Sequence, residues 1–212
     1  MTQESAQWRT KLEAVARALK ANGINAIVAE TGDEAREQAL ALIPKGASIG
    51  MGGSKTVAEI GLLDALRSPG YGLIDQYDPK LPREAVLKLR RAGLQADYFI
   101  AGSNAVTQDG KLVNVDGLGN RVAAFAFGPD KVIIVAGRNK IVKDVAAGLD
   151  RIRNIAAPAN AKRLGSATPC AATGVCSDCS VPGRICNLTL VVDKQRFPDR
   201  MTVILVNQEL GY

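Results

Sequence analysis

Two hydrophobic patterns alternate along most of the chain and predict alternating helices and strands. Trp8, Leu12, Val15 and Leu19 recur three or four residues apart, so their side chains share one face of a helix over residues 5–22. Four later stretches combine apolar positions with residues that favour helix starts or stops, such as Thr31 with Glu34, which form a capping box. These predicted helices cover residues 31–43, 54–66, 82–93 and 141–156.

Short apolar runs between the helices predict strands. The run KVIIVAG at residues 131–137 is continuous and rich in β-branched side chains, as in parallel strands that are covered on both faces. The other predicted strands cover residues 24–30, 47–51, 72–77, 96–102, 188–193 and 201–208. Strands that alternate with helices predict an α/β fold with a mostly parallel, open sheet flanked by helices.

Two segments depart from this alternation. Asp109 and Gly110 favour a hairpin turn within residues 106–115, which predicts a local antiparallel element. Residues 165–187 are rich in Gly, Pro and Ser and contain all four cysteines. We expect the two strands that follow to return to the main sheet. The Cys-rich segment would then be a metal-binding excursion from a single domain over residues 1–212.

Composition supports a cytoplasmic protein with a sizeable core. The chain has 212 residues, of which 47% are hydrophobic and 23% charged, and its mean hydropathy is +0.02. The first residues lack the apolar stretch of a secretory signal. No apolar run approaches the roughly 18–20 residues that a membrane-spanning helix needs, so we expect no membrane span.

Positive charge is concentrated in the last third of the chain. The net charge is +6, and residues 137–212 hold 11 Lys and Arg against 6 Asp and Glu. Such a region could face a small anionic ligand or an acidic partner protein. Aromatic residues make up only 4% of the chain, which disfavours nucleic acid as a partner because single-strand binding relies on stacking.

Histidine is absent from the sequence. This excludes Ser-His-Asp and Cys-His catalysis and every metal site that needs an imidazole ligand. Proton transfer near neutral pH would therefore fall to a carboxylate, Lys, Tyr, Cys or a metal-bound group.

The four cysteines favour a metal site. Cys170, Cys176, Cys179 and Cys186 form the pattern C-x5-C-x2-C-x6-C, in which four soft thiolates can converge on one centre. A [4Fe–4S] cluster suits the long flanking spacings better than Zn²⁺, because zinc ribbons pair two separated CxxC knuckles. Zinc remains the main alternative, ahead of disulfides, which are rare in cytosolic proteins, and of a redox dithiol pair.

A glycine-rich turn follows the strand at 47–51 and opens the helix at 54–66. Small residues and a helix N-terminus can bring backbone N–H groups close to an anion. The candidate anion-binding residues are Gly52, Gly53, Ser54, Lys55 and Thr56. The alternative is that Ser54 only caps the helix and Lys55 is solvated.

Polar residues also follow the strands at 96–102 and 131–137. Because the carboxyl ends of parallel strands meet at one sheet edge, where α/β proteins bind ligands, we expect these side chains to share a site with the glycine-rich turn. The candidate substrate-binding residues here are Asn104, Asn120, Arg121, Asn139 and Lys140. Glu59 and Asp116 are the best placed carboxylates for acid–base chemistry, although a structural role is the more common one for each.

Three motifs resemble the LUD-domain family (DUF162), which includes the lactate utilization protein C group. They are GGSKTVAEIGL, DYFIAGSNAVTQDGKLVNVDGLGNR and VIIVAGRNKIV, and the resemblance spans roughly residues 43–161 and extends into the Cys segment. It implies an open α/β fold like that of the sugar-phosphate isomerase and CoA-transferase superfamily (NagB/RpiA/CoA transferase-like). It also implies a role in oxidation of L-lactate to pyruvate beside iron–sulfur or other redox partner proteins. The simplest members lack the four cysteines.

These observations favour an iron–sulfur-binding, redox-associated protein of lactate or 2-hydroxy-acid utilization with a small-anion pocket. One alternative is a non-redox enzyme acting on a phosphorylated sugar or CoA ester, with a structural zinc or cluster. Another is a non-catalytic subunit that binds a partner protein.

Overall fold

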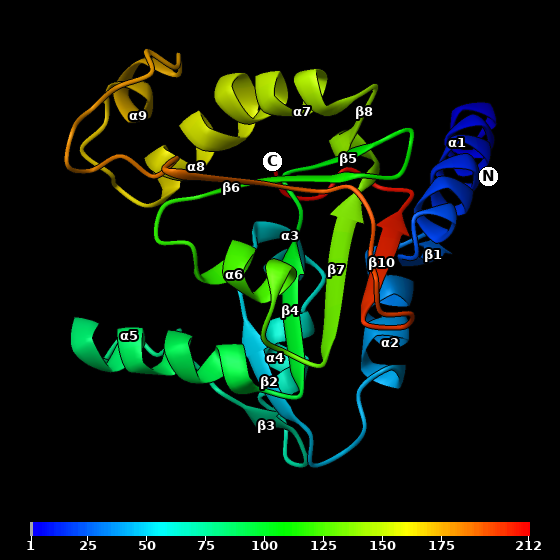
Figure 1. Cartoon of the computed structure of the whole chain (residues 1–212), viewed down its shortest axis with the longest axis horizontal. Coiled ribbons are helices and arrows are strands. Elements are labelled where there is room, and N and C mark those ends of the chain that lie inside the picture. Colours follow the sequence, from blue (N-terminus) through cyan, green and yellow to red (C-terminus); the bar gives the residue numbers. More distant parts are fainter. Residues whose placement is uncertain (1) are drawn as a thin grey trace.

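Two β-sheets form the framework of the computed structural model, which describes residues 2–212 (Figure 1). The larger sheet has six strands, all parallel, in the order β1-β10-β7-β4-β2-β3. Their bounds are β1 Asn25–Ala29, β10 Met201–Val206, β7 Lys131–Gly137, β4 Tyr98–Gly102, β2 Ser48–Met51 and β3 Gly72–Leu73. The predicted α/β fold with a mostly parallel, helix-flanked sheet is confirmed.

Alternate residues of the central strand β7 pack on opposite faces of this sheet. Ile134 joins a core with α1 (Gln3–Ala21) and α6 (Asn120–Ala126). Ile133 and Val135 join the other core with α2 (Gly32–Ala41), α3 (Lys55–Glu59) and α4 (Leu62–Leu66). Both faces are therefore covered, which explains why β7 is apolar along its whole length.

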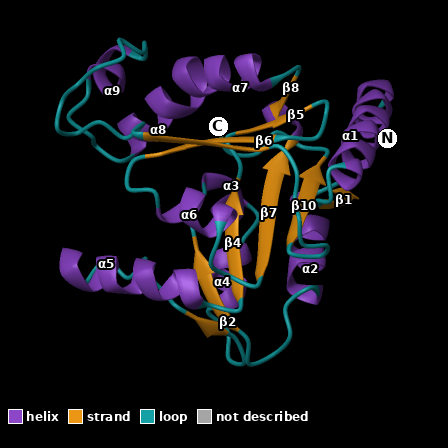
Figure 2. Cartoon of the chain, in the orientation of Figure 1, coloured by secondary structure: helices purple, strands orange, loops and turns teal. Residues whose placement is uncertain are grey.

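The smaller sheet crosses the carboxyl end of the larger one (Figure 2). Its order is β8-β5-β6-β9, with bounds β8 Ile141–Val142, β5 Ala105–Thr107, β6 Leu112–Asp116 and β9 Leu188–Val192. The predicted hairpin forms as β5 and β6, which pair antiparallel. The expectation for β9 is wrong: it does not return to the main sheet but pairs antiparallel with β6, whose outer edge is otherwise open.

Helices cover the outer face of the smaller sheet. After β8 the chain forms α7 (Val145–Arg151), a π-helical turn (Ile152–Ala156) and α8 (Ala157–Arg163), which continue past the predicted end at residue 156. Ile152 and Ala157 pack on Ala105 and Val113 of the hairpin. Beyond α8, the Cys-rich segment with α9 (Pro169–Thr173) lies at the outer end of this layer, away from the larger sheet (Figure 1).

The predicted helix over 54–66 is broken in two. Gly61 adopts a left-handed conformation with φ +69°, which ends α3 and starts α4. Neither α6 nor α9 was expected, and the strand at 72–77 is cut to two residues.

Helix α5 (Arg83–Ala92) projects from the body of the molecule (Figure 1). None of the helices in residues 2–212 has the length and apolar character that crossing a bilayer requires.

Candidate functional site

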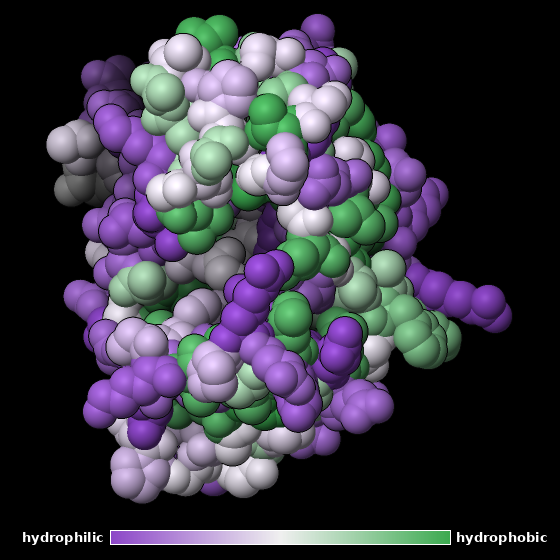
Figure 3. Space-filling model, turned by 90° about the vertical axis from the view of Figure 1, so that its left-hand side faces the viewer, coloured by the Kyte–Doolittle hydropathy of each residue, from purple (hydrophilic) through white to green (hydrophobic). Residues whose placement is uncertain are grey.

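The carboxyl ends of β2, β4 and β7 meet beneath the smaller sheet and its helices. These strands are neighbours in the order β7-β4-β2, so the three polar loops that follow them share one edge, as parallel topology requires. A cleft of about 310 Å³ opens there. Figure 3 views the side of the molecule that carries α5 and the Cys-rich segment, and a recess lies in the middle of this face.

The wall of the cleft combines predicted and unpredicted residues. The predicted ones are Gly53, Ser54, Lys55, Asn104, Asp116, Asn120, Arg121, Lys140 and Cys186. Polar residues from more distant elements, Arg90, Asn160, Arg163 and Tyr212, complete it. Of its six charged side chains, Asp116 is the only carboxylate.

Arg121 is the most extensively bonded residue of the cleft. Its Nε donates to Asp116 Oδ1 at 2.9 Å, and its Nη1 donates to the Gly102 carbonyl at 2.9 Å and to Asn114 Oδ1. Its Nη2 donates to Asn104 Oδ1 at 2.7 Å and to the Val115 carbonyl at 3.0 Å. All five N–H donors of the guanidinium therefore have protein acceptors. Arg121 joins the loops after β4 and β6 and sets the shape and charge of the cleft floor.

Asp116 is committed to the same network. Its Oδ2 accepts from the backbone N–H groups of Arg121 and Val122, both at 3.0 Å, and so caps the start of α6. Both carboxylate oxygens are occupied, and the side chains of Asp116 and Arg121 are each 9% exposed. This geometry fits a structural carboxylate better than an acid–base group.

Lys140 is nearly enclosed in the wall of the cleft. Its side chain comes from the short helical turn after β7, and the residue is 4% exposed. Nζ donates to Thr56 Oγ1 at 2.6 Å. Burial lowers the pKa of Lys140 from 10.5 to about 7, and the positive charges of Arg151 and Arg121 act in the same direction, against Glu59.

Arg151 is a second buried cation that the sequence pattern did not single out. Its Nε donates to the Asn139 carbonyl at 3.0 Å and its Nη1 to the Asn104 carbonyl at 2.8 Å. Burial lowers the pKa of Arg151. Asn104 thus accepts from Arg151 through its backbone and from Arg121 through its side chain. Arg151 lies on α7, outside every polar loop, so only the packing of α7 over the hairpin reveals it.

The glycine-rich turn divides into structural and cleft-facing residues. Ser54 caps α3 by accepting from the Val57 N–H at 3.2 Å, and Thr56 is fully buried. A Cβ on Gly52 would lie 3.0 Å from Arg121 Cγ and 3.1 Å from Ala101 Cβ, whereas a Cβ on Gly53 would meet nothing within 4 Å. Gly53 therefore borders open space in the cleft, and Gly52 supports the floor.

Two other predicted residues hold the segment Gln208–Tyr212 against the site. Glu59 accepts from the Gly211 N–H through Oε2, and its Oε1 lies 3.6 Å from Lys55 Nζ. Asn139 accepts from the Leu210 N–H at 3.1 Å and donates to the Gly211 carbonyl at 3.3 Å. Neither residue lines the cleft. Both hold the C-terminal segment that carries Tyr212 in place beside the cleft.

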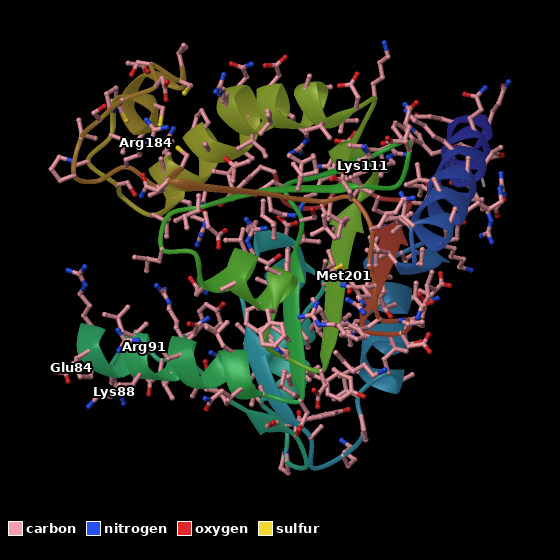
Figure 4. The ribbon with its side chains drawn as sticks, viewed as in Figure 1. Glu84, Lys88, Arg91, Lys111, Arg184 and Met201 are labelled. Carbon is pink, nitrogen blue, oxygen red and sulfur yellow. The ribbon has the colours of Figure 1, made fainter. Side chains whose placement is uncertain are left out.

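The four cysteines lie beside the cleft, and all four thiols are free. Cys186 is in the cleft wall and Cys170 is buried. Burial raises the pKa of the Cys186 thiol; Arg184 opposes this, and the other three cysteines add to it. Arg184 lies among the sulfur atoms (Figure 4) and donates to the carbonyls of Cys179 and Cys186.

The thiol set suits a soft metal, but the thiols are not gathered in one site. Among residues 2–212, no three His, Cys, Asp or Glu side chains come close enough to one another to hold a metal ion. The chemistry of the donors thus fits a metal centre, while their positions do not form one. Binding would require the thiols to converge.

Comparison with known proteins gives a family-level match. The family model described as LUD domain matches residues 12–206. A crystal structure of a DUF162 family protein from Deinococcus radiodurans is similar, with 18% sequence identity, a TM-score of 0.53, and coverage of 94% of this chain and 98% of that one. At this identity the likeness concerns the fold.

A second solved structure, of eIF2B delta from Chaetomium thermophilum, has 24% identity and a TM-score of 0.33, covering 54% of this chain and 49% of that one. This TM-score is too low to bear on the fold. No curated protein matches the chain.

Proposed function

Because the chain belongs to the LUD domain family, a family associated with lactate utilization, we propose that its cleft binds a small anionic metabolite of 2-hydroxy-acid metabolism. The observation that carries the proposal is the charge of the cleft wall. Asp116, the one carboxylate side chain of the wall, is matched by Arg121, and Lys55 pairs with Glu59. Arg90 and Arg163 remain as cations of the wall without a carboxylate partner among the described residues. A volume of about 310 Å³ suits a small ligand.

Two cations of the wall, Arg90 and Arg163, are not neutralised by neighbouring carboxylates. Within the described chain, Arg90 and Arg163 form no salt bridge with Asp or Glu; their hydrogen-bond acceptors are Gln76, Asn160 and Tyr212. Cations held by neutral acceptors in a partly enclosed site favour an incoming anion over a neutral molecule. The small ligand therefore needs a carboxylate or phosphate group.

Calorimetric titration of the full chain tests this proposal. L-Lactate, pyruvate and inorganic phosphate are the anionic probes, and lactamide is the matched neutral probe. We expect at least one anion to bind, more weakly as salt is added, and lactamide to bind far less. Equal binding of lactate and lactamide, or no binding of any of the anions, would overturn the proposal.

We also propose that Cys170, Cys176, Cys179 and Cys186 converge on an iron–sulfur cluster, with zinc as the alternative. The support is the donor chemistry of four free thiols within residues 170–186. A bound [4Fe–4S] cluster would supply one-electron transfer, and zinc would supply only cross-linking. Because Cys186 is in the cleft wall, metal loading is expected to change anion affinity. In this proposal, redox partner proteins would exchange electrons with the bound cluster.

A further inference from the structure

The side-chain amine of Lys140 is buried in the wall of the cleft, with one hydrogen-bond acceptor among the described residues. It extends from the turn after β7 into a wall in which the residue is 4% exposed. Thr56 Oγ1 is the hydrogen-bond acceptor for Nζ, at 2.6 Å. An ammonium group carries three N–H donors, so a single acceptor satisfies a charged Lys140 poorly.

The hydroxyl of Thr56 leaves the lone pair of Nζ free. Thr56 donates its own proton to the Leu210 carbonyl at 3.2 Å. Its oxygen can therefore only accept from Lys140 and cannot donate to it. A neutral amine at this position gives one N–H to Thr56 and keeps its lone pair available.

The surrounding charges favour that neutral amine. Arg121 from α6 and Arg151 from α7 both disfavour a third positive charge, and Glu59 from α3 is the carboxylate that opposes them. With burial, they bring the pKa of Lys140 to about 7. An ordinary lysine at pH 7 is neutral only on the order of once in a thousand molecules. Lys140 is thus prepared for nucleophilic chemistry that surface lysines cannot perform.

We propose that Lys140 is a nucleophile that forms an imine with the aldehyde or ketone of a small anion bound in the cleft. The inference deepens the proposed anion-binding function and rests on it. The cations of the wall would hold the carboxylate or phosphate of the ligand, and Lys140 would meet the carbonyl carbon. The shared chemistry is a carbonyl group close to an anionic group, as in 2-oxo acids and phosphorylated ketones.

The step balances without an oxidant or reductant. The Nζ lone pair forms a bond to the carbonyl carbon as the C=O π pair moves to oxygen. One proton passes from nitrogen to that oxygen, giving a carbinolamine. The nitrogen lone pair then expels the hydroxyl group, which leaves as water with the second amine proton, and a C=N bond remains.

Reductive trapping of the full-length protein tests the proposal. Pyruvate is the carboxylate probe and dihydroxyacetone phosphate the phosphate probe, each incubated at pH 7 with sodium cyanoborohydride. Intact mass would report adducts and peptide mapping would locate them. The variants are Lys140→Arg, which replaces the amine with a guanidinium that is not a nucleophile, and Lys143→Arg, an exposed control three residues away.

We expect one adduct per chain, on Lys140, with one of the two probes. It should be absent in Lys140→Arg and unchanged in Lys143→Arg, and the probe that reacts identifies the anionic group. Calorimetric binding without an adduct would overturn the imine while leaving the proposed anion site intact. Adducts spread evenly over surface lysines would also overturn it. Failure of all anions to bind would overturn both inferences.

Discussion

The carboxylate of Asp116 binds Arg121 twice, through the side chain and through the backbone. Oδ1 accepts from Nε at 2.9 Å and Oδ2 accepts from the backbone N–H at 3.0 Å. The two residues are five positions apart and enclose the turn that leads into α6. This pair fixes the floor of the cleft before any ligand arrives.

Asp116→Ala should therefore destabilise the fold. Removal of one partner leaves the buried Arg121 guanidinium without its counter-charge and α6 without its cap, which costs about 3–5 kcal/mol. Urea unfolding measures this, with the exposed Asp150→Ala as the control. If Asp116→Ala lost under about 1 kcal/mol but abolished anion binding, Asp116 would be a functional rather than a structural carboxylate.

Lys140→Met should stabilise the protein most at low pH. The folded-state pKa of about 7 lies below the ordinary 10.5, so between these values the unfolded chain binds a proton that the folded chain does not. Stability from this group rises with pH over that window, and its full penalty, at most roughly 5 kcal/mol, applies below pH 7.

Thermal unfolding of Lys140→Met and wild type from pH 6 to pH 10 measures that gain, which should shrink as pH rises. Lys143→Met controls for the loss of one positive charge. A gain that does not vary with pH would mean that Lys140 is charged in the folded protein.

Gly53→Val should weaken anion binding, whereas Gly52→Val should lower the stability of the fold. A side chain on Gly53 enters open cleft space, so this variant should lose anion binding. Its free energy of unfolding should stay within about 1 kcal/mol of the wild-type value. A Cβ on Gly52 would lie 3.0 Å from Arg121 Cγ and 3.1 Å from Ala101 Cβ, so a valine must displace them, and overpacking of this kind costs about 1–3 kcal/mol. Unchanged anion affinity in Gly53→Val would mean that the turn serves only to start α3.

Cys176→Ser should remove the metal without weakening the main sheet. Protein purified anaerobically is expected to be brown, with about four irons per chain. A serine hydroxyl is a poor substitute for a soft thiolate, so the variant should lose the iron. Ser180→Ala, in the same loop, is the matched control. Colourless wild-type protein with one zinc would contradict the iron–sulfur assignment.

The parts of the site that follow strand ends could be predicted from the sequence. The apolar run at 131–137 predicts a central strand. The carboxyl ends of parallel strands lie at one edge of the sheet, which brings Gly53, Asn104 and Lys140 together. Arg151 and Arg163 could not be predicted in this way. Arg163 lines the cleft from α8, and Arg151 binds the backbone of Asn104 and Asn139 from α7. Both positions depend on how these helices pack over the hairpin. Strand β9 was misassigned because an apolar run does not reveal which sheet has an open edge.

Strand β10 lies between β1 and β7 in the larger sheet, and this has a consequence for the order in which the chain can fold. Strand β1 pairs with β10 and with no other strand of the sheet, in the register Asn25 to Thr202 through Ala29 to Val206. During synthesis, β1 and the helix α1 that packs on it have no sheet partner until β10 leaves the ribosome, after the preceding 200 residues have been made. Closing so long a loop slows folding. Until then, the unpaired edge of β1 can pair with other strands and cause aggregation. A nascent chain stalled before residue 201 should therefore depend on chaperones, because its first strand lacks the partner strand β10.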